Sequence, residues 1–434
     1  MKKILKKLIP EKIFSIYHFL TAFTATCFYG FPSEKMIIVG ITGTKGKTTT
    51  ANFLWSVLQA GGFKTGLITT ANIKIGDEEI LNPYHMTMPG RFTVQKSLRK
   101  MLNQGCEVAI VETTSQGLVQ FRHIGINYDV AIFTNLTPEH IDSHKTFENY
   151  KQAKGILFKT LSKSKSKVID GKKILKTIIA NSDSEHSAFY LSFNADRKIT
   201  FGLGGGANFE GKLVEESKSG VLFKVGEEEF LIKILGGFNI LNALPSIVLA
   251  KELSIETSKI KEGLESLSMI PGRMEEISNQ KGITLIVDYA HEKQSMTLAL
   301  ETANKLKEES GKTIVLLGAE GGGRDKGKRP VMGEIAGRLA DFVIVSNVDP
   351  YEDDPLPIAE DIAVASEKAG KEREKNLFVI LDRREGIRKA LELAKKGDVV
   401  MITGKGAEQS MVVGGESVPW DDRDVVREEL LKIN

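Results

Sequence analysis

Residues 36–62, MIIVGITGTKGKTTTANFLWSVLQAGG, join an apolar run to a loop with glycines and then to a helical pattern. MIIVGIT predicts a buried strand, and TTANFLWSVLQAGG predicts a helix that ends at Gly61 and Gly62. A strand, a short loop and a helix in this order open a parallel α/β sheet. The rest of the fold must be compatible with this unit.

The loop GITGTKGKTTT, residues 40–50, is similar to a phosphate-binding loop. The usual pattern has a glycine five residues before Gly46, where this chain has Ile41. The backbone N–H groups of residues 44–47 can face phosphate oxygens at the start of the helix. Lys47 can neutralise phosphate charge, and the hydroxyl of Thr48 can bind magnesium. The loop therefore predicts a nucleotide site.

Two more apolar runs, CEVAIVETTS and YDVAIFTNLT, predict strands that end in polar residues. Ligands of doubly wound sheets lie at such carboxyl ends, so Glu112 is a candidate ligand of a cation that bridges phosphates. TNLTPEHIDSHKTFENYKQAK adds His140 and Lys154. Taken singly, each of the three also fits a structural or solvent-exposed position. Their combination near one predicted loop favours a site.

Composition excludes several classes of protein. The chain has 434 residues, 41% of them hydrophobic and 26% charged, which is enough for two or three domains with their own cores. The sequence lacks the interleaved basic and aromatic residues of a nucleic-acid surface, so no nucleic acid is expected as a partner. Two cysteines, Cys27 and Cys106, are too few for a disulfide framework or a cysteine-based zinc site, and they fit a reducing compartment.

The amino terminus carries an apolar and aromatic stretch, residues 14–31. Pro10 and Glu11 interrupt the pattern of a cleaved signal peptide, so that interpretation is disfavoured. A helix that packs on the next domain and a helix that contacts a membrane both fit the stretch. Both interpretations remain open at this point.

A second apolar series begins at ITLIVDYAH and continues through TIVLLGAE, DFVIVSNVD, NLFVILD and DVVMITG. We expect an α/β protein with a P-loop, doubly wound central ATPase domain and a Rossmann-like α/β C-terminal domain. The expected boundaries are 1–35 for the apolar helical segment, 36–273 for the central domain and 274–434 for the C-terminal domain. Residues 195–235 predict an insert rich in hairpins.

Eight motifs, in one order, resemble those of the Mur ligases, and most of all the ligases that add the third residue of the peptidoglycan stem peptide. The motifs are GITGTKGKTTT, ETTSQGLVQFR, FTNLTPEHIDSHKTFENYKQAK, GGFNILNAL, PGRMEE, VDYAH, GGGRDKGKRPVMGEIAGRLAD and GKGAEQ. The resemblance runs from about Met36 to the carboxyl end. It implies an ADP-forming acid–amino-acid ligase that uses ATP and two magnesium ions to form an acyl phosphate and then an amide.

The resemblance also implies roles for single residues. Thr48 and Glu112 would serve one magnesium ion, and Glu112 with His140 the other. Lys154 matches a lysine that reacts with CO2 to give a carbamate, which would support the second ion. The implied catalytic residues are Lys47, Glu112, His140, Lys154 and Arg273. The implied ATP-binding residues are Gly43, Thr44, Lys45, Gly46, Lys47, Thr48, Thr49, Asn135, Asn242, Arg273 and Asp288. The implied substrate residues are Thr87, Thr114, Gln120, Arg122, Asp349, Tyr351, Gly404 and Glu408.

The chain departs from the family pattern in three places. Only about 35 residues precede the central domain, where members of usual length carry a domain that holds uridine diphosphate. NVDPYEDDP, residues 347–355, lacks the arginine of the D-N-P-R motif that pairs with the distal carboxylate of diaminopimelate. This favours L-lysine or another diamino acid without that carboxylate, with Asp349, Glu352 or Asp353 as partners of its amine. Finally, Ala407 and Gly323 stand where His and Asp are common.

The sequence therefore predicts a cytoplasmic, monomeric ligase that acts on a muramoyl-peptide and an amino acid. Contact of residues 14–31 with a membrane surface is a further interpretation that the sequence leaves open. Two alternatives remain: a related ligase with a poly-amino-acid or folate-type γ-glutamyl acceptor, and a P-loop ATPase that has lost ligation.

Overall fold

The computed structural model describes residues 11–76, 78–84, 86–138, 144–323 and 325–433. The chain divides into two compact units. The central unit comprises Met1–Lys212, Phe223–Leu231 and Asn239–Leu267, and the C-terminal unit comprises Leu213–Leu222, Ile232–Phe238 and Ser268–Asn434.

A sheet of eleven described strands has the order β13-β12-β11-β10-β9-β6-β1-β5-β2-β3-β4. Its middle strands, from β9 to β2, run parallel to one another. The strands are β1 (Ile37–Thr42), β2 (Thr65–Ile68), β3 (Asn72–Ile75), β4 (Glu78–Leu81), β5 (Val108–Glu112), β6 (Val130–Phe133), β9 (Thr177–Asn181), β10 (Arg197–Gly202), β11 (Phe209–Ser217), β12 (Gly220–Val225) and β13 (Glu228–Ile232). The predicted strands of residues 36–42, 106–115 and 128–137 are confirmed, as is the hairpin-rich segment.

Strand β1 lies between β5 and β6, with Ile41 opposite Glu112 and Thr42 opposite Phe133. After β1 the chain forms β2 and later β5 on one side of β1, and it then forms β6 on the other side. The carboxyl ends of three strands therefore meet at one point, which is where doubly wound sheets bind ligands. All six residues of β1 are buried, as a strand covered on both faces requires.

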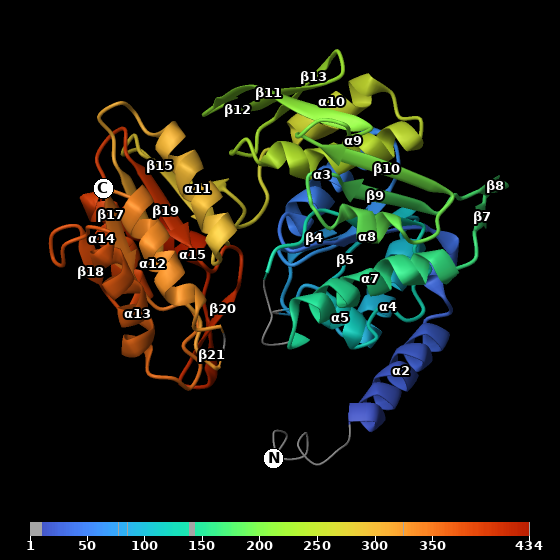
Figure 1. Cartoon of the computed structure of the whole chain (residues 1–434), viewed down its shortest axis with the longest axis horizontal. Helices are drawn as coiled ribbons and strands as arrows, with labels where there is room; N and C mark the ends of the chain where they lie inside the picture. The colour runs from blue at the N-terminus through green and yellow to red at the C-terminus, as the bar shows by residue number, and fades with distance from the viewer. Residues whose placement is uncertain (1–10, 77, 85, 139–143, 324, 434) are drawn as a thin grey trace. The chain divides into compact units, whose positions relative to one another are not determined.

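Helices cover both faces of this sheet (Figure 1). One layer contains α3 (Lys47–Ala60), α9 (Asn239–Glu252) and α10 (Thr257–Ser266), which pack against one another. The other face carries α4 (Arg91–Asn103), α5 (Ser115–Val119), α7 (Phe147–Lys163) and α8 (Ser187–Leu191). The predicted helix after the glycine loop is confirmed as α3, which ends at Ala60 with Gly61 as its cap.

A buried charge cluster lies at the opposite end of the middle strands. The Asp129 carboxylate, which has no exposed surface, accepts hydrogen bonds from Lys167 Nζ at 2.5 Å, Lys176 Nζ at 3.0 Å and the backbone N–H of Ile38 at 2.9 Å. Burial lowers the pKa of Lys167 to about 8, although Asp129 opposes the shift. We call Asp129, Lys167 and Lys176 the Asp129 cluster. It ties the beginning of β1 to the beginning of β6.

The apolar amino-terminal stretch forms helix α2 (Glu11–Phe28), which packs on α4. Its contact face includes the buried residues Ala22, Ala25 and Thr26. Among the described residues, no helix is both long and apolar enough to cross a membrane.

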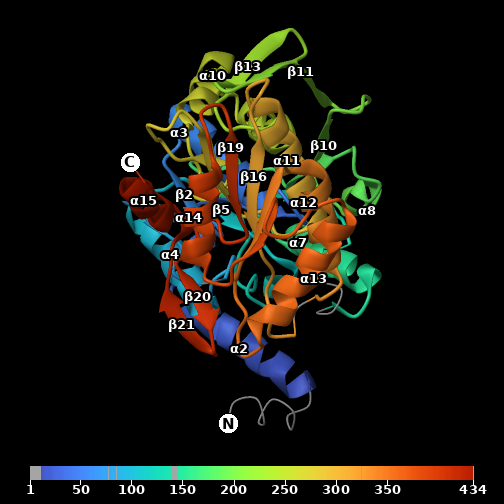
Figure 2. The ribbon, with the colours of Figure 1, turned by 90° about the vertical axis from the view of Figure 1, so that its left-hand side faces the viewer.

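The C-terminal unit contains a six-stranded sheet of order β14-β15-β19-β16-β17-β18, parallel except for β14. Its strands are β14 (Glu275–Glu276), β15 (Thr284–Asp288), β16 (Thr313–Leu317), β17 (Phe342–Val345), β18 (Leu377–Val379) and β19 (Val399–Thr403). Its helices are α11 (Lys293–Leu306), α12 (Lys328–Leu339), α13 (Pro355–Lys368), α14 (Arg383–Leu393) and α15 (Asp422–Ile433). A small hairpin of β20 (Ser410–Val413) and β21 (Glu416–Pro419) completes the unit, which Figure 2 shows in a second view. The five predicted strands are confirmed as β15 to β19.

Candidate active site

The glycine loop joins β1 to α3 through two glycines in conformations that other residues rarely adopt. Gly43 has φ 155° and Gly46 has φ 81°. A Cβ on Gly43 would lie 1.9 Å from Thr134 Oγ1, and one on Gly46 would lie 2.1 Å from Asn242 Oδ1. Both positions therefore require glycine for space as well as for backbone conformation.

The residues that directly follow β6 hold the loop in place. Asn135 Oδ1 accepts the N–H of Lys45 at 2.8 Å, and Thr134 Oγ1 donates to the carbonyl of Lys45 at 2.7 Å. The N–H of Thr44 donates to the Asn135 carbonyl at 2.9 Å. Asn242 lies beside Gly46 and donates to Asn239 Oδ1 at 2.7 Å. Asn135 and Asn242 thus both border the loop.

Glu112, at the end of β5, is buried and faces the first turn of α3. Its Oε2 accepts hydrogen bonds from Thr48 Oγ1 at 2.8 Å and from the backbone N–H of Thr70 at 2.8 Å. Thr70 Oγ1 also donates to Thr87 Oγ1 at 2.8 Å. The structure therefore places a carboxylate and a hydroxyl side by side at the start of the helix. Hard oxygen donors of this kind are the ligands that Mg²⁺ prefers, so the described residues fit the ion that the loop implies.

Two lysines approach the same loop. Lys47 Nζ donates to the carbonyl of Thr44 at 2.9 Å. Lys154, which is 2% exposed, extends from α7 and donates to the carbonyl of Gly43 at 2.7 Å. Its Nζ also lies 4.4 Å from the ring centroid of Tyr150, whose hydroxyl is 3.2 Å from Thr44 Oγ1. The buried amine of Lys154 thus directly contacts the phosphate loop.

The residues predicted for the peptide substrate lie around α5. Thr114 caps this helix by accepting the N–H of Gly117 at 3.0 Å. Arg122 Nη2 donates to Gln120 Oε1 at 2.7 Å, and Arg122 Nη1 donates to the Met88 carbonyl next to Thr87. Burial lowers the pKa of Arg122, and the charge of Arg91 lowers it further. Thr87 connects this group to Glu112 through Thr70.

In the C-terminal unit, Asp288 ends β15 and accepts the N–H groups of Met274 and Ala290, both at 2.8 Å. Burial raises the pKa of its carboxyl, and Arg273 opposes that shift. The guanidinium of Arg273 lies 4.3 Å from the ring centroid of Tyr289. Arg273 and Asp288 therefore lie close together in this unit.

Lys405, which has no exposed surface, is the centre of a second group. Its Nζ donates to Asp349 Oδ2 at 2.8 Å and to Glu408 Oε2 at 2.6 Å. Burial opposes its charge, yet the two carboxylates together raise its pKa above the usual value. Gly404 has φ 110°, and the N–H of Tyr351 donates to the Val412 carbonyl at 3.1 Å. Asp349 also accepts the N–H of Val412 at 2.8 Å, so its carboxylate is engaged by the protein.

The structure thus brings the predicted residues together in two groups, one in each unit. His140 lies outside the described residues. Sequence reasoning missed Thr70, Tyr150 and Lys405. The last two stand inside the quoted motifs FENYKQAK and GKGAEQ, which gave a signal, whereas Thr70 follows β2 in a segment without any motif.

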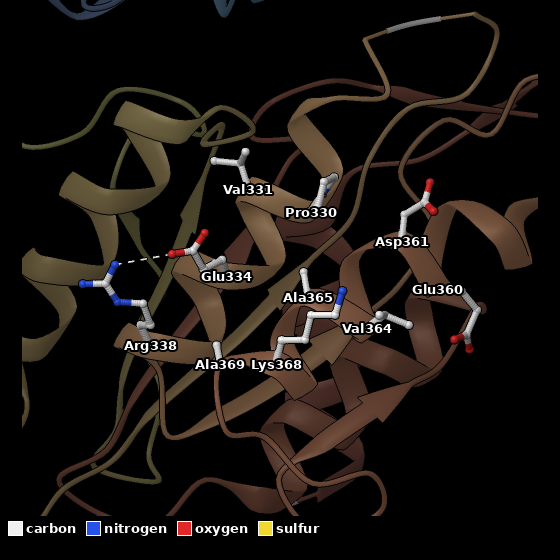
Figure 3. Close-up of a pocket in the computed structure, with 10 residues that line it drawn as sticks. All are labelled: Pro330, Val331, Glu334, Arg338, Glu360, Asp361, Val364, Ala365, Lys368 and Ala369. Atoms are coloured by element: carbon white, nitrogen blue, oxygen red, sulfur yellow. Dashed lines mark ion pairs between the residues drawn. The ribbon is translucent and has the colours of Figure 1, made fainter.

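A separate groove of about 690 Å³ lies between α12 and α13. Figure 3 shows its lining, with Arg338 paired to Glu334 at 3.5 Å. It contains none of the predicted site residues.

Known proteins with similar sequences share both units. The Mur ligase middle domain matches residues 41–250, and the Mur ligase glutamate ligase domain matches residues 272–406. The UDP-N-acetylmuramoyl-L-alanyl-D-glutamate–2,6-diaminopimelate ligase of Bacillus cereus is 35% identical over 94% of this chain and 81% of that protein. The UDP-N-acetylmuramyl-tripeptide synthetase of a Roseiflexus species is 36% identical over 94% and 81%.

A solved structure of a UDP-N-acetylmuramoyl-L-alanyl-D-glutamate–2,6-diaminopimelate ligase covers 92% of this chain and 79% of its own, with 27% identity and a TM-score of 0.61. The order of the two units and the phosphate loop agree with these matches. The chain belongs to the Mur ligase family, whose members are ATP-dependent, ADP-forming peptide ligases that use Mg²⁺.

Proposed function

We propose that this chain joins the carboxylate of a muramoyl-dipeptide to the amino group of a diamino acid, with ATP as the source of energy, in the synthesis of peptidoglycan precursors. The observation that carries the proposal is the contact of Thr48 with Glu112 directly beside the glycine loop. The named relatives, which cover most of the chain, act on substrates of this class.

The chemistry requires an activated carboxylate, because oxide is a poor leaving group. An oxygen of the carboxylate attacks the γ-phosphorus of ATP, the bond to the β,γ-bridging oxygen breaks, and ADP leaves. The amine then attacks the acyl carbon, loses a proton and displaces inorganic phosphate. The loop amides and Lys47 would orient the phosphates, and Asn135 and Asn242 would border the nucleotide. Magnesium held by Thr48 and Glu112 would offset the charge that collects in this step.

We assign the carbamate to Lys154. The ammonium would lose a proton, and the neutral amine would then add CO2 and release a second proton, which changes a cation into an anion. The support is its position: the side chain is buried, and its Nζ lies 2.7 Å from the Gly43 carbonyl, in the loop that leads to Thr48. An anion there would attract a second magnesium ion, whereas an ammonium would repel it.

We propose a diamino acid without a distal carboxylate, such as L-lysine, as the nucleophile. Tyr351 stands where a carboxylate-binding arginine is expected, and Lys405 already pairs with Asp349 and Glu408. Asp349 is buried, whereas Glu352 and Asp353 are exposed, so a distal amine would reach these two carboxylates more easily. Glu408 would meet the reacting amino group, and Tyr289 donates to its Oε1 at 3.0 Å.

The domain boundaries 36–273 and 274–434, the monomeric state and a cytoplasmic location are parts of the same proposal. The supporting observation for the location is that Cys27 and Cys106 are free thiols.

The test supplies purified protein with ATP, Mg²⁺, a panel of amino acids and muramoyl-dipeptides with and without uridine diphosphate. Phosphate release and product mass are followed together. We expect phosphate release that depends on both the amino acid and the dipeptide, with the product mass of an amide. ATP turnover that ignores the amino acid would exclude ligation. Fastest turnover with diaminopimelate would exclude the preference for lysine.

A further inference from the structure

Helix α2 carries small residues on the face that packs and large apolar residues on the face that does not. Ala22, Ala25 and Thr26 lie on one side of the helix and are at most 1% exposed. The large side chains are mostly on the other side, 43% to 74% exposed: Ile13, Ile16, Tyr17, Phe19, Leu20, Phe23 and Phe28. A helix that only packs on its own domain shows the reverse arrangement, with large apolar side chains inside.

The exposed apolar surface continues beyond α2. Phe28 lies 6.5 Å from Phe92 of α4, measured between ring centroids, and Phe92 is itself 41% exposed. Phe19 makes an edge-to-face contact with Phe121 at 6.2 Å. Figures 1 and 2 show α2 beside α4 at the margin of the central unit. A contiguous patch of this kind marks an interaction site more often than isolated exposed residues do. We call the exposed side chains of α2 together with Phe92 the α2 surface.

The positive charge of the chain is concentrated next to this surface in the sequence. Residues 1–12 contain five lysines and one glutamate, a formal charge of +4, while the whole chain carries +3. The remaining residues therefore sum to −1. No acidic residue occurs between Glu11 and Glu34. A lysine-rich segment that leads into an apolar, aromatic helix is complementary to an anionic lipid surface.

We propose that the α2 surface binds the face of an anionic bilayer, with α2 lying in the plane of the headgroups. The apolar side chains enter the boundary between headgroups and acyl chains, and the positive charge that residues 1–12 carry in the sequence favours an anionic surface. Two copies of the chain joined through α2 would each carry the charge of +4 in residues 1–12, and like charges disfavour such an association. The charge pattern thus favours lipid over a second copy. This inference concerns where the enzyme works and goes beyond the reaction proposed above.

Flotation of the full chain with lipid vesicles tests the proposal. One set of vesicles contains phosphatidylcholine with ~30% phosphatidylglycerol, which lies in the range of anionic membranes, and the other contains phosphatidylcholine alone. One variant changes Lys2, Lys3, Lys6 and Lys7 to Gln, and another carries Ile16→Asp and Leu20→Asp. The matched control carries Leu356→Asp and Leu431→Asp, which are 48% and 81% exposed in the C-terminal unit.

We expect the wild type and the control to float with the anionic vesicles, and each α2-region variant to lose at least about tenfold in the bound fraction. Raising the salt from about 0.1 M to about 0.5 M should weaken the binding, because screening shortens the reach of the lysines. The lysine variant changes none of the described core residues, so it remains informative even if the aspartates disturb α2.

Absence of flotation by the wild type would overturn the proposal, as would equal binding to both vesicle types. If the wild type does not bind lipid but forms a dimer, and the variant with Ile16→Asp and Leu20→Asp is monomeric, the α2 surface would be assigned to a second copy instead. Ligase activity with water-soluble substrates is measured on every variant. Absence of ligase activity in the wild type, with flotation intact, would count against the proposed reaction and leave the membrane surface standing.

Discussion

Lys154 is a lysine in a buried position, where a charged amine is uncommon. Its side chain is buried at the phosphate loop. If it carries a carbamate, Lys154→Ala removes an anion that supports magnesium, and ligase activity should fall on the order of 10–100-fold, as when a group that supports a metal ligand is lost. Added acetate or another short carboxylic acid should partly restore the rate, since it can occupy the space left by the side chain.

Lys159→Ala provides the control, because Lys159 lies on the same helix α7 but is exposed. It should change neither the rate nor the response to acetate. Loss of activity in Lys154→Ala without any rescue across a range of acids would argue for an ordinary ammonium at this position.

The buried His123 should make the stability of the central unit depend on pH. It is 6% exposed, and burial lowers its pKa to about 4. Its folded-state pKa lies below the unfolded value, so the neutral ring stabilises the fold fully above about pH 6.5, and this stability is lost as the pH falls toward 4. Between pH 7 and pH 4.5 the loss amounts to about 2–3 kcal/mol of unfolding free energy.

The variant His123→Gln should show a flatter dependence of unfolding free energy on pH over this range than the wild type. His186→Gln, at a partly exposed histidine, is the matched control. Urea unfolding at half-unit pH steps gives both curves, and parallel curves for the wild type and His123→Gln would refute the prediction.

Site residues that belong to sequence motifs could be predicted from the sequence. Site residues that reach the glycine loop or Glu112 only through the fold could not. Thr48 and Glu112 follow a strand or open a helix, so their positions could be inferred from the apolar pattern. Thr70 reaches Glu112 because β2 lies beside β5, a neighbour relation that no local pattern reveals.

Among the elements, the glycine loop makes the sharpest prediction. Gly46→Ala places a methyl group 2.1 Å from Asn242 Oδ1 at a φ of 81°, so the loop has to move. We expect ATP affinity to fall at least tenfold, or about 1.4 kcal/mol. Isothermal titration with ATP and Mg²⁺ measures the change.

Gly62→Ala is the control that separates the steric contact with Asn242 from the backbone strain of a positive φ. Gly62 has φ 89°, similar to Gly46, but no heavy atom lies within 4 Å of the point where a Cβ would stand. This variant should lose about 1–2 kcal/mol of stability from backbone strain and keep its ATP affinity. Equal loss of affinity in both variants would show that strain alone, and not the contact with Asn242, explains the effect.

Most strands and helices can be predicted from apolar periodicity, because β1, β5 and β6 are continuous apolar runs and α3 begins at the loop. Which face of α2 packs on the domain cannot be predicted in this way. Apolar residues occur around the whole helix, so periodicity does not tell which face packs, and the small size of Ala22 and Ala25 decides it only in three dimensions.

For the whole molecule, the two units predict two unfolding transitions, each with its own reporter. The chain has two tryptophans: Trp55 lies in the central unit and Trp420 in the C-terminal unit. Trp420→Phe leaves a reporter of the central unit alone, and Trp55→Phe leaves a reporter of the other. ATP with Mg²⁺ at about 100 times the dissociation constant should stabilise the unit with the glycine loop by about 2.7 kcal/mol.

Urea unfolding followed by fluorescence on the two single-tryptophan variants measures this shift. The transition reported by Trp55 should move to higher urea with nucleotide. A shift confined to the Trp420 reporter would contradict the assignment of the phosphates to the loop of the central unit.

The Asp129 cluster has a consequence for how this enzyme can change in evolution. It fixes the start of β1 at Ile38, while the contact of Thr48 with Glu112 fixes the loop and helix beyond the other end of the strand. Inserting one residue between these two anchors would advance the loop by about 3.3 Å and turn every later side chain of the strand to the opposite face. Insertions and deletions in β1 should therefore not be tolerated. Variation in this part of the molecule is confined to substitutions that keep the spacing between the Asp129 cluster and the glycine loop.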